Sequence, residues 1–313
     1  MKILICPLNW GLGHATRCVP IIQQLIAEGH ELVLVSDGFP LQFLRQEFPA
    51  LRVIELPSYP VHYSVGKSQI AAMFRSFPAI VKGIIREHNW LKILLKNEHF
   101  DQVISDNRFG MWSKKVHSIY ISHQLMVKMP KGLKLFEPLV WLIHRCIINR
   151  YNECWIPDTK ENGGLSGGLA HKYPLPRNAK FIGILSRFKN IKEIQPNTNF
   201  EVVAVLSGVE PQRTLLEKEI IKRYSGAKHQ TLIVLGQPRE VKKEIKIGNI
   251  TFVSHLSSPE LAGYLVGAKH IISRSGYSTI MDLSTLNCLQ KAELIPTPGQ
   301  TEQEYLFQLT VIN

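Results

Sequence analysis

A histidine follows a glycine-rich turn near the start of the sequence, where a general base would be well placed. Gly11 and Gly13 flank a leucine, and His14 comes directly after the second glycine. Two glycines let the backbone approach a ligand closely, and a helix that begins here would direct free N–H groups at that ligand. An imidazole at such a helix start suits proton abstraction. We therefore favour His14 as a general base over the alternative of a helix cap or a surface histidine.

A second group of small and polar residues lies near the end of the sequence and suits a phosphate and ribose site. Ser275 and Gly276 form a turn before a predicted helix, whose N-terminus could receive an anion. Asp282 lies nearly two turns into that helix, where its carboxylate could accept hydrogen bonds from ribose hydroxyls. Three polar residues after a Pro/Gly loop suit sugar hydroxyls, namely Gln300, Glu302 and Gln303. The alternative is a solvated helix start whose acidic residues the helix dipole favours.

Short apolar strands alternate with helical segments, which indicates parallel sheets covered on both faces. In the first half we expect strands at 2–6, 31–36, 102–105 and 118–122 and a helix at 14–28. In the second half we expect strands at 202–206, 231–235 and 270–273 and helices at 214–224 and 261–266. The fold class is therefore α/β, with two doubly wound, Rossmann-like domains that face a cleft.

The polar segment 189–199 is the predicted linker between an N-terminal domain, residues 1–188, and a C-terminal domain, residues 200–313. Ligands of such sheets bind at the carboxyl ends of the strands. Asp106 follows the strand at 102–105 and could orient His14 or bind an acceptor. An equally good interpretation of Asp106 is a loop acid that caps the next element.

Both motifs resemble those of glycosyltransferase family 28, which includes the enzyme that adds N-acetylglucosamine to the lipid-linked peptidoglycan precursor. The matching residues are Gly11-Leu12-Gly13-His14, Ser273-Arg274-Ser275-Gly276 with Asp282, and Ile295-Pro296-Thr297-Pro298-Gly299 with Gln303. The resemblance implies the GT-B arrangement of the two domains. It also implies an inverting transfer of an N-acetylglucosamine-like hexose from a nucleoside-diphosphate donor, a UDP-sugar, to a glycan or lipid-linked acceptor of the cell envelope.

The resemblance implies roles for individual residues. His14 matches the proposed base, Asp282 the ribose-binding acid, which is most commonly Glu, and Gln303 the contact to the donor sugar. Ser275 and Gly276 match the donors to the diphosphate. The loop 207–214 lies where the family has a second phosphate-facing loop, which makes weaker candidates of Gly208, Arg213 and Thr214.

The resemblance further implies that the transfer uses no metal and no cofactor besides the nucleotide sugar, and no DxD carboxylate pair occurs in the sequence. Family members continue through further helix that crosses back onto the N-terminal domain. This chain stops at Asn313, and its tail, 307–313, shows no clear helical periodicity. We therefore expect a truncated C-terminal end with a loosened domain interface.

The composition is that of an ordinary soluble globular protein, with 45% hydrophobic and 20% charged residues and a net charge of +12. Scattered cysteines without CxxC spacing favour a cytoplasmic location. The basic surplus indicates an anionic partner. The amphipathic segments 67–96 and 125–150 could lie on the inner face of an anionic membrane, although such apolar stripes are more often core. Peripheral membrane contact stays open.

Three alternatives also stay open. A dinucleotide-dependent oxidoreductase would use Gly11, Gly13 and Asp37, but Thr16 stands where that fingerprint needs a third glycine. A nucleotide-sugar epimerase shares the fold and donor site and would turn over the donor alone. A non-catalytic nucleotide-sugar-binding protein would result if the truncation abolished turnover. No nucleic-acid-binding module is recognisable, so we expect no nucleic-acid partner.

Overall fold

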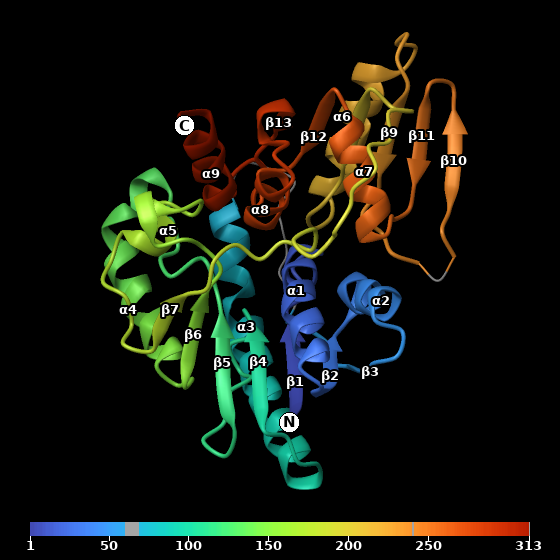
Figure 1. Cartoon of the computed structure of the whole chain (residues 1–313). Coiled ribbons are helices and arrows are strands. Elements are labelled where there is room, and N and C mark those ends of the chain that lie inside the picture. The colour runs from blue at the N-terminus through green and yellow to red at the C-terminus, as the bar shows by residue number, and fades with distance from the viewer. Residues whose placement is uncertain (60–68, 240, 313) are drawn as a thin grey trace.

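The computed structural model describes residues 1–59, 69–239 and 241–312, which form two lobes with one sheet each (Figure 1). In the described part of the N-terminal lobe, seven parallel strands follow the order β3-β2-β1-β4-β5-β6-β7. These strands are β1 (Lys2–Pro7), β2 (Glu31–Ser36), β3 (Arg52–Glu55), β4 (Gln102–Asp106), β5 (His117–Ile121), β6 (Glu153–Ile156) and β7 (Ala179–Phe181). The central strands are buried on both faces, which explains their continuous apolar runs.

Helices cover both faces of this sheet. Its helices are α1 (Gly13–Ala27), α2 (Gly38–Glu47), α3 (Gln69–Asn97), α4 (Glu137–Ile148) and α5 (Gly168–His171), with short 3-10 turns η1 (Lys131–Phe136) and η2 (Glu161–Gly163). Alternate residues of β1 face opposite sides. Ile3 and Ile5 lie in one core cluster with Val19 of α1, whereas Leu4 lies in another with Leu91 of α3. Gly29, with φ +77, ends the turn after α1.

The C-terminal lobe repeats this design with a sheet in the order β10-β11-β9-β8-β12-β13. Its strands are β8 (Val202–Val205), β9 (Thr231–Val234), β10 (Glu244–Ile247), β11 (Ile250–Val253), β12 (His270–Ser273) and β13 (Ala292–Leu294). Its helices are α6 (Gln212–Tyr224), α7 (Ser258–Gly267), α8 (Tyr277–Thr285) and α9 (Thr301–Ile312), with the 3-10 turn η3 (Leu289–Lys291). Only β10, among the described strands, pairs antiparallel. The predicted α/β class with two Rossmann-like domains is confirmed.

The segment between the sheets crosses from one lobe to the other. Residues 182–201, all of them described, form no helix or strand. The predicted linker, 189–199, lies within this segment. The domain boundaries at 188 and 200 stay a prediction about folding units, because helix α9 of the second half packs on the first lobe.

The tail of the chain is helical, which corrects the prediction drawn from its weak periodicity. Helix α9 extends to Ile312, and contacts with the N-terminal lobe hold it. The Thr301 hydroxyl donates to the carbonyl of Lys128 over 2.7 Å, and the Tyr305 hydroxyl accepts the Gly168 N–H over 2.7 Å. The Lys128 ammonium also lies 4.0 Å from the centre of the Tyr305 ring. Tertiary contacts of this kind stabilise a helix that its own periodicity does not indicate.

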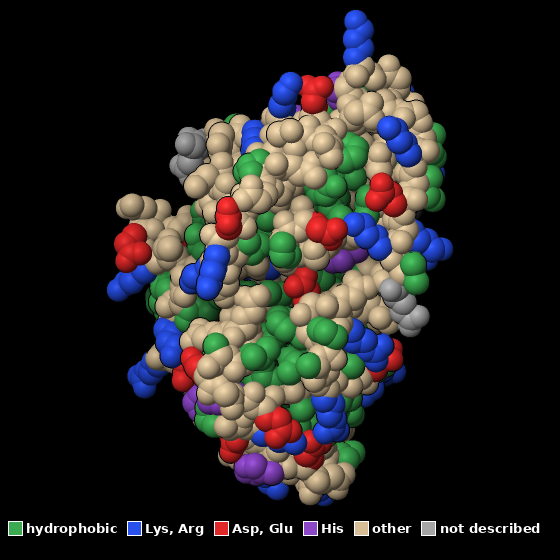
Figure 2. All heavy atoms as spheres, turned by 45° about the vertical axis from the view of Figure 1, so that its right-hand side comes forward, with side chains coloured by type: hydrophobic (Ala, Val, Ile, Leu, Met, Phe, Trp, Pro, Cys, Tyr) green, Lys and Arg blue, Asp and Glu red, His purple; other side chains and the backbone are tan. Residues whose placement is uncertain are grey.

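Basic side chains are spread over the surface rather than gathered on one lobe in the view of Figure 2, where Lys and Arg alternate with Asp and Glu. The net charge is +12. A surplus spread in this way gives a general attraction for anions and does not by itself mark a binding surface.

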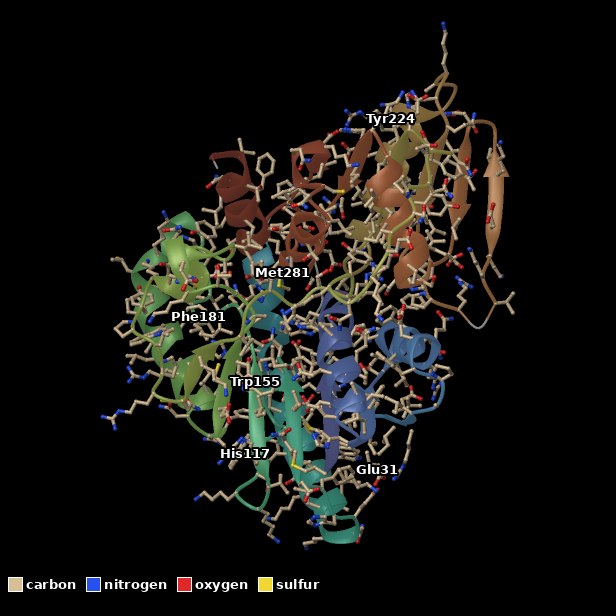
Figure 3. All side chains as sticks on the ribbon, in the orientation of Figure 1. Glu31, His117, Trp155, Phe181, Tyr224 and Met281 are labelled. Atoms are coloured by element: carbon tan, nitrogen blue, oxygen red, sulfur yellow. The ribbon has the colours of Figure 1, made fainter. Side chains whose placement is uncertain are left out.

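The two lobes meet through a shared hydrophobic core that includes residues of α1 and α8. One hydrophobic cluster contains residues of both sheets, including Ile5 of β1, Val203 of β8 and Met281 of α8. Helices α1 and α8 are in contact. In Figure 3, Met281 lies where the lobes meet, whereas Tyr224 lies at the far end of the C-terminal lobe. The carboxyl ends of the central strands of both sheets face this junction, which is where a ligand site is expected.

Candidate functional site

A cavity of about 310 Å³ lies between the lobes and is lined from both. It receives the N-termini of α1, α8 and α9, whose dipoles and free N–H groups favour an anion. No side-chain hydrogen bond caps α1 or α8 in the described structure. Nine of the predicted site residues line this cavity: Gly11, Gly13, His14, Gly208, Gly276, Asp282, Gln300, Glu302 and Gln303.

The glycine turns of the two lobes lie against each other at this cavity. The Ser278 hydroxyl of α8 donates to the carbonyl of Gly13 over 2.9 Å. A Cβ on Gly13 would lie only 2.9 Å from that hydroxyl oxygen, so a larger residue would displace the Ser278 side chain from this hydrogen bond. Gly11 and Gly208 have φ of +92 and +98, and a Cβ on Gly11 would lie 3.7 Å from the Gly208 backbone. Glycine at these positions therefore lets the loops of both lobes close on one ligand.

His14 is held by the carboxylate at the end of β4. Its Nδ1 lies 2.7 Å from Asp106 Oδ1, and the Asp106 side chain is only 1% exposed. Arg17 Nη2 also lies 3.0 Å from this nitrogen, and an arginine can only donate. The Asp106 carboxylate is closer and, when ionised, can only accept, so we place the imidazole proton on Nδ1. No described residue makes a hydrogen bond to Nε2, and His14 lines the cavity. The lone pair of Nε2 is therefore available to a substrate.

A buried arginine completes this arrangement. Arg17 lies one turn after His14 and is 2% exposed. Its Nε donates to Asp106 Oδ2 over 2.5 Å, and its Nη2 donates to Oδ1. Burial opposes ionisation of Asp106, but the charges and hydrogen bonds of Arg17 and His14 outweigh it and hold its pKa at about 2. Asp106 is thus ionised throughout the physiological range.

The same surroundings keep the His14 imidazole neutral. Burial lowers the pKa of His14 below 6.5, and the Arg17 charge lowers it further against the opposing effect of Asp106. A neutral imidazole is the form that can accept a proton.

We therefore expect kcat to keep its plateau as the pH falls past 6.5, the ordinary pKa of histidine, and to decline only as the pH falls through the lowered pKa of His14. The measurement is kcat at saturating donor from about pH 4.5 to pH 8.5, with circular dichroism at each pH as the control for folding. An acidic limb centred above pH 6.5 would contradict this placement of the base.

On the donor side, Asp282 is held by two residues of the crossing segment. The Ser186 hydroxyl donates to Asp282 Oδ1 over 2.6 Å, and Arg187 Nε lies 3.6 Å from Oδ2. Burial raises the pKa of Asp282, with Arg187 opposing the rise. Arg187 also lines the cavity, and its Nε and Nη1 have no hydrogen-bond partner among the described residues. This corner therefore presents a carboxylate together with unused N–H groups.

Some residues around the Pro/Gly loop line the cavity, whereas others are bonded within the protein. Gln303 Oε1 accepts the Thr297 N–H over 2.8 Å, and its carbonyl accepts the Ser275 hydroxyl over 2.8 Å. Ser275 is fully buried and does not line the cavity. Glu302 pairs with His123 of the N-terminal lobe over 2.8 Å. Its carboxylate thus bridges the lobes while also lining the cavity.

Besides Ser275, two predicted donor contacts are not brought to the cavity. The guanidinium of Arg213 turns along α6 to Glu210 and to Glu217, which it contacts over 3.0 Å. Thr214 binds Arg213 through its hydroxyl and Glu210 through its N–H. The oxidoreductase candidate Asp37 is likewise engaged, because it accepts the Ser58 hydroxyl over 2.6 Å and does not line the cavity.

Sequence reasoning missed five residues that contribute to the site, namely Arg17, His123, Arg187, His255 and Tyr277. Arg17 stands three positions after His14 on the same helix, and this spacing places both on one face. His123 follows β5 as Asp106 ends the neighbouring β4, so adjacent parallel strands carry both to one sheet edge. Tyr277 lies directly after Gly276 of the second motif, but its residue type alone predicted no role. Nothing in the sequence marks Arg187 or His255.

Within the described residues, no group of three or more His, Cys, Asp or Glu side chains could hold a metal ion.

Solved structures of GT-B glycosyltransferases share this fold. The glycotransferase of kitacinnamycin aligns with 99% of this chain and 90% of its own, at a TM-score of 0.56 and 14% identity. The spinosyn rhamnosyltransferase SpnG aligns with 99% of this chain and 84% of its own, at a TM-score of 0.57 and 13% identity. The predicted GT-B fold is confirmed.

Sequence comparison leads to the same class of enzyme. A Methanosarcina mazei protein named an uncharacterized glycosyltransferase is 23% identical over 330 residues, covering 97% of this chain and 82% of the relative. A Methanosarcina acetivorans protein of the same name is 24% identical over 184 residues, covering 56% of this chain and 43% of the relative. No protein-family model matches the chain. The relatives and the structural neighbours thus agree with the predicted enzyme class, glycosyltransferase, at this general level.

Proposed function

We propose that this chain is an inverting glycosyltransferase that moves a sugar from a nucleoside-diphosphate donor to a hydroxyl of its acceptor. The observation that carries the proposal is the His14–Asp106 pair, held at 2.7 Å, with Nε2 at a cavity that also receives the N-terminus of α8. A base and an anion-binding helix end are the two groups that such a transfer needs. Here they come from opposite lobes of one cleft.

The nucleoside diphosphate would bind on the C-terminal side of the cavity. Its diphosphate fits the N-terminus of α8 at Gly276, and Asp282 would accept from the ribose hydroxyls. Two neighbours with this fold carry such nucleotides in their names, since SpnG is described with thymidine diphosphate and LpCGTa with UDP. The family 28 resemblance favours UDP and an N-acetylglucosamine-like hexose, with Gln300, Glu302 and Gln303 at the sugar.

In this mechanism Nε2 of His14 takes the proton of the acceptor hydroxyl while its oxygen attacks the anomeric carbon. The bond between that carbon and the diphosphate oxygen breaks, and the diphosphate leaves with the electron pair. Its growing charge meets the free N–H groups at the start of α8. A single displacement on the face opposite the leaving group inverts the anomeric configuration. The protein's residues supply every step, so we propose that no metal is required.

Turnover with and without an acceptor tests this function. The purified chain is incubated with UDP-, GDP- and dTDP-sugars, with sugar, glycan and lipid-extract acceptors, and with or without EDTA. We expect acceptor-dependent release of one nucleoside diphosphate, an inverted product by NMR and no loss with EDTA. Acceptor-dependent release that EDTA abolishes would contradict the metal-free mechanism, and a product of retained configuration would contradict the single displacement.

The same assay separates the epimerase alternative, which one neighbour favours. A candidate UDP-N-acetylglucosamine 2-epimerase from Listeria monocytogenes covers 100% of this chain and 88% of its own, at a TM-score of 0.55 and 11% identity. An epimerase converts the donor sugar without any acceptor, whereas a transferase does not. A new sugar nucleotide in the donor-alone sample would therefore replace the proposed function. Binding without turnover in any sample would indicate a non-catalytic nucleotide-sugar-binding protein.

The Asp282→Ala variant is expected to weaken nucleoside-diphosphate binding by about 1–3 kcal/mol, the cost of removing one partner from a buried hydrogen bond. Isothermal titration calorimetry gives this difference, and urea unfolding checks that the variant is folded. Asp101→Ala, which removes a carboxylate at the opposite end of the N-terminal lobe, is the matched control. An equal loss of affinity in both variants would refute the ribose role of Asp282.

We further propose that the N-terminal lobe contacts an anionic membrane through a surface formed by η1 and α4. Its exposed apolar side chains are Leu135, which is 92% exposed, Phe136, Leu139, Leu142 and Ile143. Lys134 and Arg145 lie among them, as on helices that rest on anionic lipid. None of the described helices is long and apolar enough to cross a membrane. Residues 69–96 of the other amphipathic segment lie in α3, and the side chains of 67–76 fall outside those that the structure describes.

We expect the double variant Leu135→Asp/Leu139→Asp to reduce binding to vesicles containing phosphatidylglycerol by at least about tenfold, since each buried leucine contributes about 1.5–3 kcal/mol. Cosedimentation measures the bound fraction. The matched control, Ile245→Asp/Ile247→Asp, changes two exposed side chains of β10 in the other lobe. Equal vesicle binding by both variants would rule out this surface. Membrane contact would then no longer support a lipid-linked acceptor.

A further inference from the structure

A continuous series of polar contacts connects the C-terminal lobe to His14. Glu302, in the first turn of α9, lies 2.8 Å from Nε2 of His123. Nδ1 of His123 accepts a hydrogen bond from Arg17 Nη1 over 3.0 Å. Arg17 binds Asp106 through its other two nitrogens, and Asp106 binds His14. One of these nitrogens, Nη2, also lies 3.0 Å from Nδ1 of His14. The donor side of the cleft is therefore joined to the base by side chains alone.

The direction of the two hydrogen bonds at His123 follows from Arg17, which has only donors. Because Arg17 donates to Nδ1 of His123, the His123 imidazole carries its proton on Nε2 and donates it to Glu302. His123 is 5% exposed, so neither ring nitrogen can exchange its partner for bulk water without a rearrangement. One imidazole thus fixes a guanidinium of its own lobe and a carboxylate of the other.

A second contact from the C-terminal lobe fixes the plane of the same ring. Tyr277, the first residue of α8, stacks on His123 with ring centres 4.1 Å apart and planes inclined by 7°. The Tyr277 hydroxyl donates to the carbonyl of Pro157 over 2.9 Å. The two helices that start at the donor side of the cavity, α8 and α9, therefore both contact His123.

We propose that His123 is a positioning residue that orients the base when the donor-binding lobe is seated. Glu302 and Tyr277 hold the His123 ring, the ring holds Arg17, and Arg17 sets the Asp106 carboxylate to which His14 is bonded. This inference rests on the proposed function, because the group being positioned is the base of that reaction. A purely structural imidazole would fill the same space without affecting the orientation of His14.

Kinetics of single and double variants test the proposal. His123→Phe keeps a ring against Tyr277 but cannot bond Arg17 or Glu302. We expect kcat to fall by about 10- to 100-fold, as for a displaced catalytic group, while KM for the donor stays within about threefold. Glu302→Ala should also lower kcat. The double variant should have the same kcat as His123→Phe, because both changes interrupt the same series of polar contacts. The proposal would be overturned if the two single effects on kcat multiplied in the double variant, or if His123→Phe kept the wild-type kcat.

A control and a spectroscopic measurement keep this test separate from the proposed function. His144→Phe removes another buried imidazole of the same lobe, one bonded to Tyr120 and the carbonyl of Leu125, and should retain kcat. Histidine ¹⁵N NMR reports the tautomer of His14 without turnover. We expect the Nδ1–H pattern in the wild type and its loss or averaging in His123→Phe and in Glu302→Ala, which alters a partly exposed residue. An unchanged His14 pattern in both would overturn the inference, whereas a wild type without turnover would count only against the proposed function.

Discussion

Replacing His14 with alanine is expected to lower kcat by about 10²–10⁴-fold, the contribution of a positioned general base. The donor should still bind, because Asp282 and the N-terminus of α8 lie in the other lobe. The Kd for the nucleoside diphosphate is therefore expected to stay within about threefold of the wild-type value. Transfer is followed by nucleotide release, and donor binding by calorimetry.

The control for this variant is His99→Ala, at an imidazole whose side chain is 83% exposed and bonded only to Asp101 in the described structure. It should leave both kcat and Kd unchanged. A parallel loss of kcat and donor affinity in His14→Ala would mean that His14 binds the donor rather than the acceptor proton. Wild-type kcat in this variant would remove His14 from the reaction.

The second large effect is expected for Asp106→Asn, which should lower both turnover and stability. An amide nitrogen facing Nδ1 of His14 would donate to it and place the imidazole proton on Nε2, the wrong tautomer for a base. By analogy with the corresponding change in serine proteases, kcat should fall by about 10⁴-fold. The variant also leaves the buried Arg17 guanidinium without its countercharge, at a cost of about 3–5 kcal/mol in the free energy of unfolding.

A paired variant separates these two effects. Arg17→Met with Asp106→Leu removes both buried charges and fills their space, so stability should return to within a few kcal/mol of the wild type. Turnover should remain as low as in Asp106→Asn, because His14 still lacks its carboxylate. Urea unfolding and kcat are measured on the same preparations. Turnover that recovers with stability would show that Asp106 acts only as a structural ion-pair partner.

The sequence was sufficient to predict the fold because parallel sheets leave strong patterns. Strands β1, β2, β4, β8 and β12 are short and largely apolar, and their bounds lie within one or two residues of those predicted. Three of the strands that were not predicted lack this pattern. β10 is exposed along its whole length, and β3 and β7 have three or four residues each at the edge or outer part of a sheet. Their pairing depends on neighbours that a local pattern does not include.

The site was predictable where a motif carries its own geometry. His14 and Gly276 each stand at the start of a helix that follows a buried strand, so chain order alone directs them to the same edge. The contact between Glu302 and His123 requires knowing how close the lobes lie, which no local pattern gives. Arg213 shows the opposite error. Its place in a loop favoured a phosphate, but Glu217, one turn later on α6, takes its guanidinium instead.

Nucleotide binding is the most direct test of the proposed donor site, since it needs no knowledge of the acceptor. Thermal shift and calorimetry are run on the wild type and on Asp282→Ala with UDP, GDP, dTDP, their common sugars, NAD and NADP. We expect stabilisation by one nucleoside diphosphate and its sugar, most simply UDP, with the affinity reduced in Asp282→Ala. Stabilisation by NAD or NADP alone, or no response to any nucleoside diphosphate, would contradict a glycosyltransferase donor site in this cleft.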